Sequence, residues 1–184
     1  MNSSVTLPEN IVLIGFMGCG KSTVGRELHQ RLGFQLADMD QIIEQRTGKP
    51  ITSIFADEGE QAFRDMETAL LKELGAPDAP RRIISTGGGV VVRAENRDLI
   101  RSLGYVVWLD APIKVILERT RKNRTRPLLL TDEDPEERIR NMMEARRPFY
   151  QETAHLKLDT GGLDCGELAT GILECARYHF SNRP

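Results

Sequence analysis

The chain has 184 residues, of which 40% are hydrophobic and 28% are charged. This length is typical of one domain, and the composition excludes a disordered or collagen-like chain. The 25 basic and 27 acidic side chains leave a formal charge of −2, so we expect no nucleic-acid partner and no attraction to a membrane. The basic side chains divide into 19 Arg and 6 Lys. Arg matches carboxylate and phosphate oxygens with a planar set of donors, although genomic base composition would also explain such a surplus.

The cysteines and the N-terminus bear on the compartment. Cys19, Cys165 and Cys175 have no Cys-x-x-Cys spacing, so neither a disulfide framework nor a zinc site is predicted. Residues 1–10 lack the basic and apolar regions of a secretory signal peptide. The longest apolar runs are far shorter than the roughly 20 residues that a membrane span needs. We therefore expect a cytoplasmic protein.

Apolar patterning and helix punctuation divide the chain into alternating strands and helices. Short apolar runs predict strands at 11–14, 34–38, 83–84, 105–109 and 155–158. Helical patterns fall at 22–32, 39–48, 94–103, 112–121, 135–150 and 164–178, and apolar side chains recur at helical spacing throughout 51–74. Strands that alternate with helices predict βαβ units, and hence a parallel sheet with helices on both faces. The expected fold class is α/β, with 1–184 as a single domain.

Residues 15–22, GFMGCGKS, match the phosphate-binding pattern GxxxxGK[ST]. The match lies between a predicted strand and a predicted helix, as the motif requires. Its glycines let backbone N–H groups curl around phosphate oxygens, and the helix N-terminus adds a positive dipole end. In such a loop Lys21 reaches the β- and γ-phosphates, and the Ser22 hydroxyl binds Mg²⁺. The sequence thus predicts a site for a nucleoside triphosphate with Mg²⁺. It lacks the guanine-reading NKxD motif of Ras-type GTPases.

Acidic side chains follow two of the predicted strands. Asp38 and Asp40 follow the second strand, at the sheet edge where the phosphate loop also lies. One of them can serve Mg²⁺ while the other accepts a proton from a substrate hydroxyl, but turn and helix-cap acids have the same pattern. Asp110 follows the fourth strand and precedes Ala-Pro at a helix start. We interpret Asp110 as structural rather than as a metal ligand.

Further motifs accompany the phosphate loop in a fixed order. They are DxD at 38–40, FRxxE at 63–67, STGGG at 85–89, RPLL at 126–129 and RxPxY at 146–150. In order and spacing, over nearly its whole length, the sequence resembles the shikimate kinases. The resemblance implies a three-layer α/β/α P-loop kinase fold whose five-stranded parallel sheet has the order 2-3-1-4-5. It implies ATP-dependent phosphorylation of the 3-hydroxyl of shikimate, in the biosynthesis of chorismate and aromatic amino acids. A monomer is expected.

The resemblance also implies how ATP and its metal ion are bound. ATP would contact the loop residues Gly18, Cys19, Gly20, Lys21, Ser22 and Thr23. Arg119 would lie flat on the adenine, and Arg126 would reach the phosphates from a lid at about 119–134. Ser22 would bind Mg²⁺ directly, and Asp38 would hold it through water.

On the substrate side, the resemblance implies a site built within 39–74, a substrate-binding subdomain, and from later motifs. Shikimate would be bound by Asp40, Arg64, Gly87, Gly88, Gly89 and Arg146. Asp40 would be the general base, with Lys21 and Arg126 as the other catalytic residues. Arg64 and Arg146 would clamp the substrate carboxylate, and Glu67 would orient Arg64.

Simpler interpretations compete with several of these roles. Arg64 and Glu67 can preset a donor pair for a carboxylate, or they can form a surface salt bridge that contributes little. Three successive glycines favour close approach to a ligand, with a plain loop as the alternative. The basic run within 119–130 would also suit a solvated helix end.

The alternative function is a kinase for another small polyhydroxy acid such as gluconate. An inactive nucleotide-binding regulator would have lost Lys21 or Asp40, and both are present.

Overall fold

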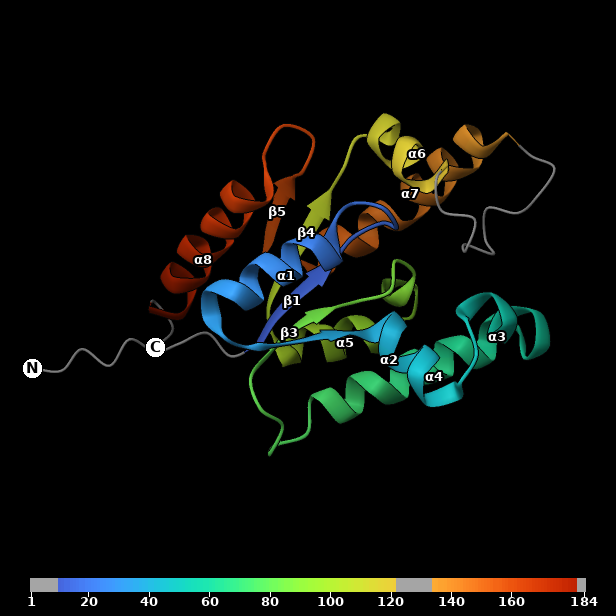
Figure 1. Ribbon diagram of the computed structural model, residues 1–184, viewed down its shortest axis with the longest axis horizontal. Helices are drawn as coiled ribbons and strands as arrows, with labels where there is room; N and C mark the ends of the chain where they lie inside the picture. Colours follow the sequence, from blue (N-terminus) through green and yellow to red (C-terminus); the bar gives the residue numbers. More distant parts are fainter. Residues whose placement is uncertain (1–9, 122–133, 182–184) are drawn as a thin grey trace, which may run out of the picture.

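The computed structural model describes residues 10–121 and 134–181, and within them five strands form one parallel sheet (Figure 1). The sheet order is β2-β3-β1-β4-β5. The strands are β1 (Asn10–Ile14), β2 (Gln35–Asp38), β3 (Arg82–Ser85), β4 (Gly104–Asp110) and β5 (Leu156–Asp159). In register, Val12 of β1 pairs with Ile84 of β3 and with Val106 of β4. The α/β class and the predicted strand order are confirmed.

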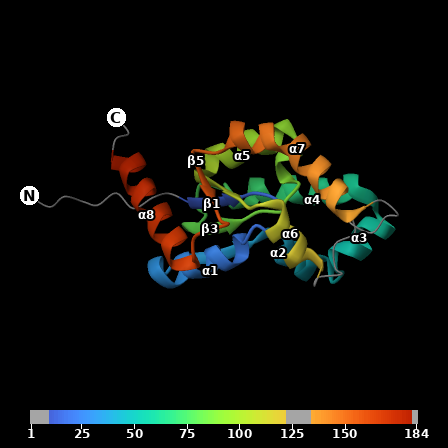
Figure 2. The same ribbon diagram turned by 90° about the horizontal axis from the view of Figure 1, so that it is seen from above.

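Two hydrophobic cores lie on opposite faces of this sheet. In β1, Ile11 and Leu13 belong to one core, and Val12 and Ile14 belong to the other. All four side chains are fully buried, because successive strand residues point to opposite faces. Helices α1 (Lys21–Leu32) and α8 (Cys165–Ser181) pack on the first face, and α4 (Gly59–Leu74) and α5 (Ala94–Leu103) pack on the second. Figure 2 shows α1 and α5 on opposite sides of the sheet, which gives the expected three layers.

The other helices connect and flank these layers. They are α2 (Met39–Thr47), α3 (Ile51–Asp57), α6 (Ile113–Arg121) and α7 (Pro135–Thr153), with the short 3₁₀ helix η1 (Val90–Val92). The apolar stretch 51–74 forms two helices, separated at Glu58. Gly59, the next residue, has a φ of +85°, in the left-handed region that interrupts a right-handed helix. Among the helices in the described part of the chain, none is long and apolar enough to cross a membrane.

The sheet brings separate parts of the sequence to one edge. Because β1, β2 and β3 are parallel neighbours, their carboxyl ends lie together. The phosphate loop follows β1, Asp38 ends β2, and the glycine-rich segment follows β3 at Ser85. The backbone N–H of Thr86 donates to the carbonyl of Leu13 at 3.1 Å, which attaches the glycine-rich segment to β1. In α/β sheets this edge is where ligands bind.

Candidate active site

The phosphate loop has a backbone that requires glycine at three positions. Gly15, Gly18 and Gly20 have φ values of +142°, +78° and +103°, which side chains rarely tolerate. A side chain at Gly15 would also overlap the carbonyl of Leu109. Gly20 caps α1 and has no side chain that could bind the first N–H groups of that helix. The loop therefore has the form of an anion cradle at a helix N-terminus.

Lys21 lies inside the curve of this loop. Its Nζ donates to the carbonyl oxygens of Gly15 at 2.8 Å and Phe16 at 3.0 Å. The side chain is buried, and these two carbonyls keep its ammonium group hydrogen-bonded. A phosphate in the loop would offer stronger, charged acceptors to the same group.

Ser22 and Asp38 meet beside the loop. The Ser22 hydroxyl donates to Asp38 Oδ2 at 2.7 Å, and Asp38 Oδ1 accepts the backbone N–H of Gln41 at 3.4 Å. Asp38 is thus the N-cap of α2, as one interpretation of the sequence proposed, and it also contacts the phosphate loop. Mg²⁺ in kinases is held by one or two protein oxygens together with waters and substrate phosphates, and this pair of oxygens fits that pattern. Among the described residues there is no cluster of three or more His, Cys, Asp or Glu that could hold a metal ion by itself.

A cavity of about 510 Å³ lies over the phosphate loop. Its walls include the predicted ATP residues 18–23, the acids Asp38 and Asp40, and Gly88. Arg119 of α6 forms another wall, and its Nη1 donates to the carbonyl of Gly18 at 3.0 Å. The wall after β5, where the sequence pointed to no particular side chain, consists of Thr160, Leu163, Asp164, Cys165 and Leu168. That segment lacks a recognisable motif and comes beside the loop because β5 pairs in parallel with β4 and α8 packs on α1.

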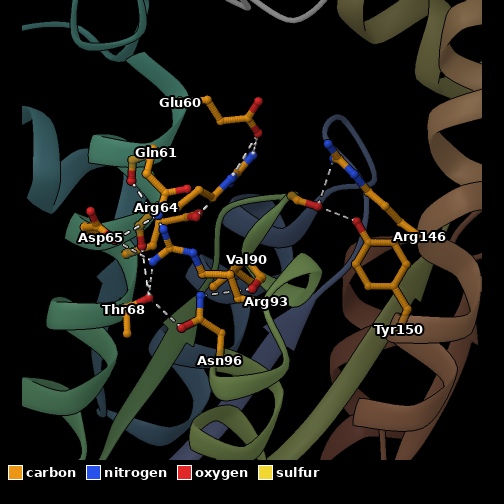
Figure 3. Close-up of polar contacts among 12 residues, drawn as sticks. Glu60, Gln61, Arg64, Asp65, Thr68, Val90, Arg93, Asn96, Arg146 and Tyr150 are labelled. Carbon is orange, nitrogen blue, oxygen red and sulfur yellow. Dashed lines mark hydrogen bonds and ion pairs between the residues drawn. The ribbon is translucent and has the colours of Figure 1, made fainter. Parts of the chain in front are cut away.

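Next to this cavity, Arg64 is buried between two carboxylates of its own helix, of which Figure 3 labels Glu60. Arg64 Nη1 donates to Glu67 Oε2 at 2.7 Å, and Nη2 donates to Glu60 Oε1 at 2.9 Å. Arg64 is 6% exposed and Glu67 is 0% exposed. The interpretation of the Arg64–Glu67 pair as a surface salt bridge is therefore wrong. Glu60, four residues before Arg64, was not predicted to take part, although its i, i+4 spacing is a signal for pairing.

Glu67 is an unusual carboxylate because it is fully buried. Burial raises its pKa to about 7 and the nearby charge of Asp40 adds to the rise, whereas Arg64 and Arg146 oppose it. Its second oxygen, Oε1, is buried without a hydrogen-bond partner among the described residues. A side chain at Gly87 would overlap this oxygen and would lie 2.9 Å from Asp40 Oδ1. Glu67, Asp40 and Gly87 are thus immediate neighbours.

The glycine-rich segment is held between the two candidate clamp arginines. Arg146 Nη1 and the hydroxyl of Tyr150 both donate to the carbonyl of Gly88, the former at 3.2 Å (Figure 3). A side chain at Gly89 would overlap the guanidinium of Arg64. The side chains of Arg64, Glu67 and Arg146 thus lie close to the backbone of residues 87–89. Close approach of a ligand to this segment stays a prediction. Burial raises the pKa of Tyr150 above its usual value, so its hydroxyl stays protonated and donates.

Two further predictions concern Asp110 and the lid with Arg126. Asp110 pairs with Lys157 at 3.0 Å and with Arg147 at 3.3 Å, in keeping with a structural role. It does not line the cavity over the phosphate loop. Arg126 and most of the expected lid lie outside the described residues. All other predicted site residues lie in or beside that cavity.

Comparison with known proteins shows the family of this chain. A family model described as shikimate kinase matches residues 17–177. A shikimate kinase of Thioalkalivibrio sulfidiphilus is 43% identical, over 97% of this chain and 90% of that protein. The structure of shikimate kinase from Acinetobacter baumannii in complex with shikimate has a TM-score of 0.87 and 41% identity, and it covers 97% of this chain and 96% of that one.

The alternative substrate class has weaker support. A gluconokinase from Sinorhizobium meliloti has a TM-score of 0.57 and 19% identity, over 96% of this chain and 99% of that one, which shows a common fold alone. The matches to shikimate kinases span almost the whole chain at more than twice that identity. The chain belongs to the shikimate kinase family and is an enzyme that phosphorylates shikimate at the expense of ATP.

Proposed function

We propose that Asp40, Arg64, Arg146 and the segment 87–89 bind shikimate with its 3-hydroxyl directed at the phosphate loop. One observation carries this assignment: Asp40 lines the cavity over the loop and is also next to Gly87 and Glu67. A shikimate molecule there would have its carboxylate on the arginines, because paired Arg donors suit a carboxylate. Its hydroxyls would then face Asp40.

In the proposed reaction, Asp40 is the general base. It takes the proton from the 3-hydroxyl as the oxygen of that hydroxyl forms a bond to the γ-phosphorus of ATP. The bond from the γ-phosphorus to the bridging oxygen breaks, and ADP leaves. Lys21 would leave the carbonyls of Gly15 and Phe16 and bind the phosphate oxygens, where its charge stabilises the transferring group.

Nucleotide binding is assigned to residues 18–23 and to Arg119, with Arg126 completing the phosphate contacts from the lid at about 119–134. We propose that the bound metal ion is Mg²⁺, held by Ser22 and, through water, by Asp38. When bound, it neutralises charge on the β- and γ-phosphates. Residues 39–74 would form the substrate-binding subdomain. That the enzyme is a cytoplasmic monomer remains a prediction.

The experiment is a coupled assay of ADP release with purified enzyme and Mg-ATP. We expect turnover with shikimate and background rates with gluconate and with nucleoside monophosphates. The reason is that neither alternative offers a ring carboxylate to both Arg64 and Arg146. Turnover with shikimate equal to the rate without any acceptor would overturn the proposed function.

A further inference from the structure

The Arg64 guanidinium pairs with more carboxylate groups than a clamp for an anion needs. Glu67 accepts from Nη1 at 2.7 Å, and Glu60 accepts from both Nη2 at 2.9 Å and Nε at 3.2 Å. Three of the five guanidinium N–H groups are therefore engaged in the structure. In Figure 3 the Glu60 carboxylate lies at the end of the Arg64 guanidinium.

The charges around Arg64 indicate that the substrate carboxylate and the Glu60 carboxylate compete for its guanidinium. Arg64 and Arg146 supply two positive charges, whereas Glu60, Glu67 and Asp40 are three acids around them. While Glu60 stays on Arg64, these five side chains have no net positive charge to attract the substrate anion. The substrate carboxylate would also be the third carboxylate on the Arg64 guanidinium. Like charges at such distances repel and raise the cost of binding.

Of the two carboxylates on Arg64, Glu60 is the one that can leave. The Glu67 side chain is 0% exposed, so moving it would break a buried pair, which is costly. The Glu60 side chain is 55% exposed and can turn into water. It also stands in the first turn of α4, where the positive end of the helix dipole stabilises a carboxylate even without Arg64. Its release therefore costs little.

We propose that Glu60 occupies Arg64 in the substrate-free enzyme in place of the substrate carboxylate and turns out into water when the substrate binds. The inference rests on the proposed role of Arg64 as a carboxylate clamp. Glu60 keeps the guanidinium paired and aligned while the site is empty. In exchange, it lowers the affinity for the substrate.

The test is Glu60→Gln in the full-length enzyme, because the amide keeps the shape and removes the competing charge. We expect the KM and the calorimetric Kd for shikimate to fall by about two- to five-fold, without a matching fall in kcat and with the KM for ATP unchanged. The methyl ester of shikimate has no carboxylate charge, so its KM should not fall. A shikimate KM that stays the same or rises, or an equal gain with the ester, overturns the inference.

Two further variants separate this inference from the function on which it rests. Glu27→Gln is the matched control, because Glu27 and Arg31 form the same i, i+4 pair at 2.8 Å on α1, and it should leave the shikimate KM unchanged. Arg64→Lys tests the clamp itself and should raise the shikimate KM. If Arg64→Lys has no effect, the assignment of Arg64 fails and the inference fails with it. If Arg64→Lys raises the KM and Glu60→Gln does not lower it, the inference alone fails.

Discussion

The hydroxyl of Ser22 donates a 2.7 Å hydrogen bond to Oδ2 of Asp38, which joins the first turn of α1 to the end of β2. The two residues are 16 positions apart in the sequence and meet because β1 and β2 end at the same edge of the sheet. A hydroxyl and a carboxylate oxygen in this position can serve the same Mg²⁺. The contact therefore links the phosphate loop to the end of β2, in the position proposed for the metal ion.

Asp38→Asn tests that link. The amide removes the negative charge while it keeps an oxygen that can cap α2, so the fold should persist. We expect the Mg²⁺ concentration for half-maximal activity to rise by about 10- to 100-fold, as is usual when a residue that positions a metal ion is changed. A magnesium titration of the rate at saturating ATP and shikimate measures this. An unchanged midpoint would remove Asp38 from the metal site.

Asp40→Asn tests the proposed base. An amide cannot accept the hydroxyl proton, so kcat should fall by about 10²–10⁴-fold. ATP binding should survive, because Asp40 is not part of the phosphate loop. Steady-state kinetics with shikimate and calorimetry with ATP measure the two effects separately. If kcat stays at the wild-type value, the base is a different group.

The sequence could predict those parts of the site that local patterns carry. A glycine loop after a strand and acids at a strand end are visible without coordinates, and the sheet order followed from the family resemblance. The burial of Glu67 could not be predicted, because an i, i+3 pair with Arg64 has the same spacing on a solvated helix face. Its full burial depends on α2 and the glycine-rich segment, which reach it from other parts of the chain. The wall at 160–165 likewise depends on tertiary packing.

Glu67 should make the stability of the protein depend on pH. Its pKa rises from 4.5 to about 7 on folding, so between these values the folded protein binds more protons than the unfolded chain. This group therefore makes the free energy of unfolding decrease as the pH rises from about 4.5 to 7, and its effect is constant above that range. Glu67→Gln has no such titration. We expect the melting temperature of the wild type to fall relative to that of Glu67→Gln across this range, by several degrees.

Melting curves of both proteins at matched ionic strength, from pH 4.5 to 8, measure the difference. Titrating groups that are remote from Glu67 are common to the two proteins and cancel in the comparison. Glu73→Gln is a suitable control, because the Glu73 carboxylate is exposed and paired with Arg46 on the surface. Wild-type and Glu67→Gln curves that run parallel would mean that Glu67 does not titrate in this range.

Gly87→Ala should damage the substrate side of the site and spare the nucleotide side. A methyl group at residue 87 would overlap Glu67 Oε1 and lie 2.9 Å from Asp40 Oδ1, so both carboxylates must shift. Overpacking of this kind typically costs about 1–3 kcal/mol, and the strain falls on the proposed base. We expect kcat/KM for shikimate to fall by at least about tenfold, since small displacements of reacting groups are costly.

The Kd of the Gly87→Ala variant for ATP should stay the same, because Gly87 does not line the cavity over the phosphate loop. Gly171→Ala is the matched control, since a methyl group there meets no atom within 4 Å and Gly171 does not line the cavity. Equal kinetics for the two alanine variants would show that the close approach at Gly87 has no part in catalysis.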